Sequence, residues 1–148
     1  NEMADQMVGI NMLKSLPFVD SDRIGVHGWS YGGFMTISLM TNYPETFKVG
    51  VAGGPVIDWK WYEIMYGERY MESLIGKVDG LKGKLLICQG AIDNTVVWEH
   101  SLSFVQKCVE NNVQLDYFPY PCSEHNVFGK WRIHLMDKVT NYFDDYLK

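Results

Sequence analysis

Three residues of this sequence have the types and the chain order needed for nucleophilic acyl transfer: Ser30, Asp93 and His125. Ser30 lies at the centre of residues 28–32, Gly-Trp-Ser-Tyr-Gly, which fit the pattern G-x-S-x-G. A serine hydroxyl is a poor nucleophile until a base takes its proton, and a histidine base needs a carboxylate that orients its ring. We therefore interpret Ser30 as the nucleophile, His125 as the general base and Asp93 as the residue that orients His125.

This serine pattern is informative only on a sharp turn between a strand and a helix. Residues 23–28 predict a short buried strand, and residues 34–40 predict the helix after it. We expect Gly28 and Gly32 to be glycines because a Cβ atom at either position would collide with its neighbours. Tyr31 follows the serine at the start of the helix, so its N–H is the predicted donor to an oxyanion.

The acid and the base each follow a predicted strand. Asp93 comes just after the apolar residues 85–90, and His125 comes after the strand predicted at 114–120. In open α/β sheets, ligands bind at the carboxyl ends of the strands, so these loops should meet near the serine. The order Ser, Asp, His is also the order of the triad in the α/β-hydrolase fold.

The remaining elements complete an alternating pattern of strands and helices. A second strand is predicted at 47–54, and helices are predicted at 5–16, 97–108 and 131–147. Continuous apolar strands that alternate with helices predict an α/β fold with a mostly parallel sheet and helices on both faces.

Helical spacing also predicts which side chains the helices bury. In the helix at 97–108 we expect Leu102, Val105 and Val109 to form one face. The first helix has apolar residues at Met3, Met7, Ile10 and Leu13. The last helix has them at Leu135, Val139, Tyr142, Phe143 and Tyr146.

Residues 58–71 are unusually aromatic, with five aromatic side chains among interleaved charges. One interpretation is a packed helix of the core. The other is an aromatic pocket wall, which its position just after a strand favours.

Composition excludes several other classes. The 148 residues suffice for one domain, and the net charge of −5 argues against a nucleic acid partner. No apolar run is long enough to span a bilayer. No cofactor or metal site is expected, and Cys88, Cys108 and Cys122 are interpreted as chemically inert. His27, His100 and His134 are interpreted as structural, because they lie in a strand or on helices rather than in loops.

These motifs resemble the C-terminal hydrolase domain of the prolyl oligopeptidase superfamily. The resemblance rests on residues 28–33, on Tyr62 with residues 66–70, on Asp93 and on residues 124–125. The dipeptidyl peptidase IV branch fits best, and residues 51–59 and 64–70 look closer still to bacterial prolyl tripeptidyl aminopeptidases.

The resemblance implies a serine peptidase that releases N-terminal di- or tripeptides by cutting after proline, without a cofactor. It implies a homodimer, and a periplasmic, cell-surface or secreted location. It also implies a proline pocket at the positions Val56, Trp59, Tyr62, Tyr66 and Val96, with Glu63 as a candidate for binding the substrate amine.

The chain also departs from the pattern of this superfamily. Thr95 stands where relatives carry an asparagine that binds a substrate carbonyl, although Asn94 is adjacent. The chain is interpreted as the C-terminal portion of the catalytic domain, residues 1–148, without the N-terminal β-propeller and the first hydrolase strands. The strand at 23–28 should then have an open edge, and the chain alone should be weakly active or inactive.

Two alternatives remain open. One is a carboxylesterase or acylaminoacyl-peptidase that uses the same triad. The other is a hydrolase-like module without chemistry, which dimerises through exposed aromatic residues of the last helix at Tyr142, Phe143 and Tyr146.

Overall fold

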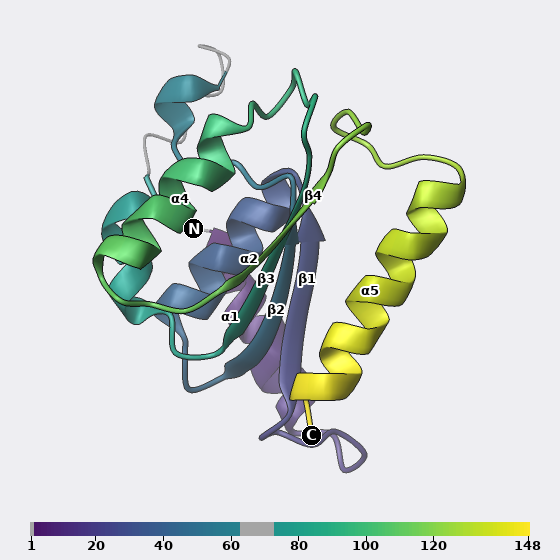
Figure 1. Ribbon diagram of the computed structural model, residues 1–148. Coiled ribbons are helices and arrows are strands. Elements are labelled where there is room, and N and C mark those ends of the chain that lie inside the picture. Colours follow the sequence, from purple (N-terminus) through teal and green to yellow (C-terminus); the bar gives the residue numbers. More distant parts are fainter. Residues whose placement is uncertain (1, 63–72) are drawn as a thin grey trace.

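A parallel four-stranded sheet forms the centre of the computed structural model, which describes residues 2–62 and 73–148 (Figure 1). The strands are β1 Ile24–Trp29, β2 Phe47–Gly53, β3 Lys84–Gly90 and β4 Asp116–Tyr120. Their order in the sheet is β1-β2-β3-β4, and each neighbouring pair is parallel. All four carboxyl ends therefore lie at one edge of the sheet.

Helices cover both faces of this sheet (Figure 1). In the described residues the α-helices are α1 Glu2–Lys14, α2 Tyr31–Asn42, α4 Glu99–Glu110 and α5 Lys130–Tyr146. Two 3₁₀-helices, η1 Trp59–Trp61 and η2 Ile75–Gly80, lie between β2 and β3. Among the described residues, helices α1, α2 and α4 pack on one face and α5 packs on the other. The predicted α/β class and the helices on both faces are confirmed.

Strand β3 shows how the sequence builds these two layers. Leu85 and Ile87 are fully buried in the cluster that contains side chains of α2 and α4. Leu86 and Cys88, which alternate with them, are buried against α5. Because successive side chains of a strand point to opposite faces, a continuous apolar run is what a doubly covered strand needs.

Strand β1 is an edge strand among the described residues, since only β2 pairs with it. The open edge expected here is confirmed, but the expectation that His27 is buried is wrong. The side chain of His27 is exposed, and its Nδ1 atom lies 2.8 Å from the Val51 carbonyl oxygen.

The predicted apolar face of α4 is also wrong. Leu102 and Val109 are 45% and 67% exposed, whereas Phe104 and Cys108 are fully buried. His100 and Ser101 precede them on the buried side of the helix. Because two polar residues lie on the buried side, the spacing of apolar residues in the sequence does not identify that side.

In α1 the apolar spacing holds for only part of the helix. Met3, Met7 and Ile10 pack against the core at partial burial, but Leu13 is 46% exposed.

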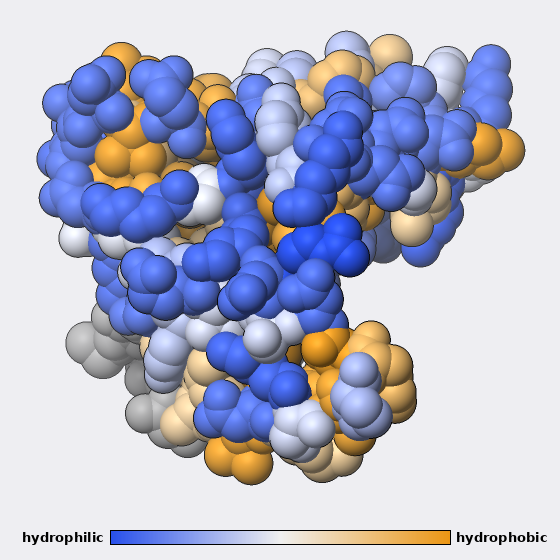
Figure 2. Space-filling view, turned by 90° about the horizontal axis from the view of Figure 1, so that it is seen from below, coloured by the Kyte–Doolittle hydropathy of each residue, from blue (hydrophilic) through white to orange (hydrophobic). Residues whose placement is uncertain are grey.

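Viewed from below, the surface shows apolar patches set among hydrophilic side chains (Figure 2).

The last helix, α5, buries more of its aromatic residues than expected. Tyr142 is buried, and its hydroxyl donates to Asp116 Oδ2 at 2.8 Å, so the idea of an exposed Tyr142 is wrong. Phe143 is half-buried, and Tyr146 is exposed.

Candidate active site

The turn between β1 and α2 holds Ser30 in an unusual backbone conformation. Ser30 has φ 59° and ψ −117°, and a positive φ is uncommon for residues other than glycine. Its N–H donates to the Gly53 carbonyl oxygen at 2.8 Å, and its carbonyl oxygen accepts from the Phe34 N–H at 3.1 Å. Such strain persists only where the surrounding structure imposes it, and it is the strand-to-helix geometry that exposes a nucleophilic serine.

The two glycines of the serine motif differ in their roles. A Cβ atom on Gly28 would overlap the carbonyl group of Gly32 and would lie 2.8 Å from its Cα atom, so the expected collision is confirmed there. At Gly32 the expectation is wrong, because a Cβ atom would meet none of the described neighbouring atoms within 4 Å. The backbone of Gly32 itself forms the close contact, so only Gly28 must lack a side chain.

Tyr31 is the first residue of α2. Its N–H therefore lies at the positive end of the helix dipole, next to the serine, where negative charge is stabilised. Its ring lies 5.7 Å from that of Phe34 and 6.1 Å from that of Trp59 (between centroids). The residue thus belongs both to the serine turn and to the neighbouring aromatic cluster.

Asp93 and His125 meet at the carboxyl ends of β3 and β4. His125 Nδ1 lies 2.7 Å from Asp93 Oδ2. The other carboxylate oxygen, Asp93 Oδ1, accepts from the N–H groups of Thr95 and Val96 at 2.8 Å each. Asp93 is only 4% exposed, and both of its carboxylate oxygens have hydrogen-bonding partners. Because Nδ1 is used by Asp93, the other ring nitrogen of His125 can act as a base.

Gly53 and Gly54 lie between the turn that holds Ser30 and the ring of His125. The Trp29 indole N–H donates to the His125 carbonyl oxygen at 2.8 Å. Gly54 has φ 45°, and a Cβ atom there would lie 3.2 Å from His125 Cε1. Gly53 in turn accepts from the Ser30 N–H. Within the described ranges no hydrogen bond joins the Ser30 and His125 side chains, and such catalytic contacts often tighten only with substrate.

Aromatic side chains lie beside this corner. Trp59 and Val56 are buried, and Tyr62 is half-buried. The rings of Trp59 and Tyr62 meet edge to face, with centroids 5.4 Å apart, and Phe34 lies 5.4 Å from Trp59. Val96 follows Asp93 in the loop between β3 and α4 (the acid loop), and it is fully buried in the same cluster.

Part of the predicted pocket falls on residues that the structure does not describe. Glu63 and Tyr66 lie outside the described residues, as does the segment 66–70. The described part of residues 58–71 contains the single 3₁₀ turn of η1, so the choice between a helix and a pocket wall stays open for the rest.

The cysteines differ in exposure. Cys88 and Cys108 are buried, whereas Cys122 is exposed. Burial raises the pKa of the Cys88 thiol to about 12 and that of Cys108 to about 11, against the opposing charge of Lys138 in the first case. Neither buried thiol forms a reactive thiolate at neutral pH.

Two contacts in this region had no signal in the sequence. The bond from Trp29 to His125 joins residues 96 positions apart. His100, interpreted as structural, accepts hydrogen bonds from the backbone N–H groups of Ile57 and Asp58. Both act through the backbone, which residue types and spacing do not reveal.

Comparison with known proteins gives the family. The model of the prolyl oligopeptidase family, a peptidase family, matches residues 1–148. This chain belongs to the prolyl oligopeptidase family. In the part of the chain that the structure describes, no helix has the length and apolar character to cross a bilayer.

Other members of the prolyl oligopeptidase family show the branch. A dipeptidyl-aminopeptidase B of Aspergillus oryzae is 38% identical over 95% of this chain. A crystal structure described as a dipeptidyl aminopeptidase IV from Bacteroides ovatus has a TM-score of 0.93 at 54% identity, over 98% of this chain. Dipeptidyl peptidase 4 of Porphyromonas gingivalis has a TM-score of 0.89 at 32% identity, over 98% of this chain. The chain is therefore in the dipeptidyl peptidase IV branch and has an α/β-hydrolase-like fold. It spans 17% of the Aspergillus protein and 22% of each of the two crystallised chains.

Proposed function

We propose that this chain carries the catalytic triad of a serine peptidase that releases N-terminal dipeptides by cutting after proline. The observation that carries the proposal is the 2.7 Å contact between Asp93 and His125, at the same sheet edge as the strained Ser30. A carboxylate held by two N–H groups and bound to Nδ1 fixes the ring and its tautomer, which is the role of the acid in a triad.

The proposed reaction has two halves. Ser30 Oγ attacks the carbonyl carbon of the proline while His125 takes its proton, and the Tyr31 N–H stabilises the oxyanion. His125 then protonates the leaving amine as the carbon–nitrogen bond breaks. Water then attacks the acyl-enzyme, with His125 again as base and then acid, and releases the peptide acid and free Ser30. Asp93 keeps the charged imidazole in place throughout.

Aromatic surface beside the triad supports proline as the residue before the cut. Val56, Trp59 and Val96 are buried in one apolar cluster, and Tyr62 packs against it at partial burial. A proline ring is compact and apolar, and it packs well against aromatic faces. Tyr66 and Glu63 remain proposed parts of this pocket on the strength of the resemblance.

The names of the relatives support release of two residues rather than three. The Aspergillus, Bacteroides and Porphyromonas proteins are all described as dipeptidyl peptidases or aminopeptidases. Tripeptide release stays a prediction that the substrate comparison below decides. The homodimer also stays a prediction.

Four substrates test the proposal in the intact protein. Nitroanilides of the forms Xaa-Pro, Xaa-Ala and Xaa-Xaa-Pro are compared with a nitrophenyl ester of a short acid. We expect kcat/KM to be highest for Xaa-Pro, and we expect Ser30→Ala to abolish turnover and labelling by a fluorophosphonate. Preference for Xaa-Ala would contradict the proline pocket. Preference for Xaa-Xaa-Pro would show tripeptide release, and preference for the ester would support the esterase alternative.

We propose, from the resemblance, that the catalytic domain has further strands and a second oxyanion donor outside these residues. Removal of a single oxyanion donor lowers the rate by about 10²–10³-fold in other hydrolases. We therefore expect the 148-residue chain alone to turn over the Xaa-Pro substrate far more slowly than the intact protein. Equal rates would contradict this proposal.

A further inference from the structure

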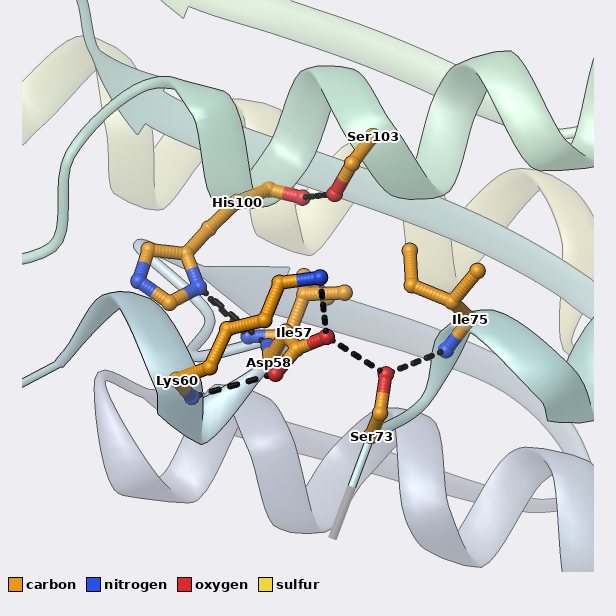
Figure 3. Close-up of polar contacts among 7 residues, drawn as sticks. All are labelled: Ile57, Asp58, Lys60, Ser73, Ile75, His100 and Ser103. Carbon is orange, nitrogen blue, oxygen red and sulfur yellow. Dashed lines mark hydrogen bonds and ion pairs between the residues drawn. The ribbon is translucent and has the colours of Figure 1, made fainter. Parts of the chain in front are cut away.

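His100 connects α4 to the segment that carries the proposed proline pocket (Figure 3). Its side chain is fully buried in the first turn of α4. Its Nδ1 atom accepts from the N–H of Ile57 at 3.0 Å and from the N–H of Asp58 at 3.3 Å. These two residues lie directly between Val56 and Trp59, so the imidazole holds the backbone from which both pocket side chains project.

These contacts fix the protonation state of His100. A nitrogen that accepts from two N–H groups carries no proton, so the ring is neutral with its proton on Nε2. Burial lowers the pKa of His100 to about 4, against the opposing charges of Asp58, Asp93 and Glu99. A second proton on the ring would face two amide donors and break both contacts.

The carboxylate of Asp58 fixes the same segment through hydrogen bonds to Lys60 and Ser73 (Figure 3). Asp58 Oδ1 accepts from the Lys60 N–H at 3.1 Å, and Oδ2 accepts from the Ser73 hydroxyl at 3.0 Å. Lys60 Nζ lies 3.2 Å from Oδ2. Burial alone would raise the pKa of Asp58, but the hydrogen bonds from Lys60 and Ser73 hold it below its usual value.

We propose that His100 is a positioning residue for substrate binding, because its unprotonated nitrogen fixes the backbone of Ile57 and Asp58 beneath the pocket side chains. The inference rests on the proposed function, since the pocket is the one proposed to bind proline. His100 is the second residue of α4, which begins where the acid loop ends, so it links that loop to the pocket segment. It touches no reacting atom.

An isosteric pair of substitutions in the intact protein tests this role. His100→Asn places a carbonyl oxygen near the position of Nδ1 and keeps an acceptor, whereas His100→Leu has a similar shape and keeps none. We expect His100→Leu to raise KM for the Xaa-Pro nitroanilide at least tenfold with a change in kcat of less than threefold. We expect His100→Asn to stay within about threefold of the wild type in both constants.

Ser103→Ala is the matched control. Ser103 lies on the same helix, and its hydroxyl donates to the backbone carbonyl oxygen of His100 at 2.8 Å. We expect its KM to be unchanged. Equal KM values for the Asn and Leu variants would overturn the proposal, because shape alone would then account for them.

Two further measurements keep the test decisive. A fluorophosphonate reacts with Ser30 without filling the proline pocket, so its labelling rate should be the same in all variants. Absence of labelling or of Xaa-Pro turnover in the wild type would refute the proposed function itself. If His100→Leu does not fold, His100→Asn decides: a KM within threefold of the wild type supports the proposal, and a tenfold rise contradicts it.

Discussion

At the residue scale, individual hydrogen bonds determine how firmly His125, the proposed base, is held. The Trp29 indole N–H is the link between the serine turn and the backbone of the His125 loop. Trp29→Phe keeps an aromatic ring and leaves the His125 carbonyl oxygen without this donor, a loss of about 1–1.5 kcal/mol. We expect kcat/KM for the Xaa-Pro substrate to fall about tenfold.

Trp98→Phe is the control for this measurement. The Trp98 indole N–H also donates a hydrogen bond, but to a side chain, the Tyr117 hydroxyl, at an exposed position. Its kcat/KM should match that of the wild type. A Trp29 variant with unchanged kinetics would show that the bond to His125 has no part in positioning the base.

The cysteines give a prediction that does not depend on the proposed function. Cys122 is exposed, whereas burial raises the pKa of Cys88 and of Cys108 well above neutral pH. We expect a disulfide reagent to label Cys122 rapidly and the other two only after unfolding. Labelling of the Cys122→Ser variant in its native state would contradict this.

Residue types and their order predict part of the candidate site, but not all of it. Asp93 and His125 could be found because each comes just after an apolar strand, and parallel strands bring such loops together. The buried face of α4 could not, because His100 and Ser101 occupy it and polar residues are usually exposed. The contact of Trp29 with a carbonyl 96 residues away leaves no trace in local spacing.

At the scale of elements, the close approach of α2 to β1 depends on Gly28. A Cβ atom there would overlap backbone atoms of Gly32, which cannot move aside without disturbing the turn. We expect Gly28→Ala to lower the thermal midpoint strongly and to abolish labelling of Ser30.

Gly9→Ala offers the contrasting case. Gly9 lies within α1, and a Cβ atom there would meet no described atom within 4 Å. Alanine should raise the stability by up to about 1 kcal/mol because it favours the helix. A thermal melt of both variants compares the two glycines directly.

The packing of α4 predicts a pH dependence of stability. The pKa of His100 is about 4 in the folded protein and 6.5 ordinarily. Between these values the unfolded chain binds more protons, so stability decreases as the pH falls from 6.5 to 4, by up to about 3 kcal/mol in all. Above 6.5 this contribution is fully present.

The charges of Asp58, Asp93 and Glu99 act on His100, so the measurement is the difference between two proteins that share these three residues. We compare the free energy of unfolding of the wild type and of His100→Asn across this range. The wild type should lose stability more steeply. Parallel curves would show that the ring is not held neutral.

At the scale of the whole molecule, the edge of β1 determines how the chain behaves alone. An unpaired strand edge is a template for pairing with another chain. We expect the isolated 148-residue chain to associate at micromolar concentration, as measured by light scattering. A stable monomer would contradict this prediction.

The order of the sheet has a consequence for synthesis. Because strand order equals chain order, each strand can dock on one that has already left the ribosome, and contacts between neighbours form early. Ser30 emerges long before His125, and α5 is the last of these elements to emerge and cover the second face. A nascent chain of this kind holds Ser30, the proposed nucleophile, but stays without His125, the proposed base, until β4 and the loop after it have been made.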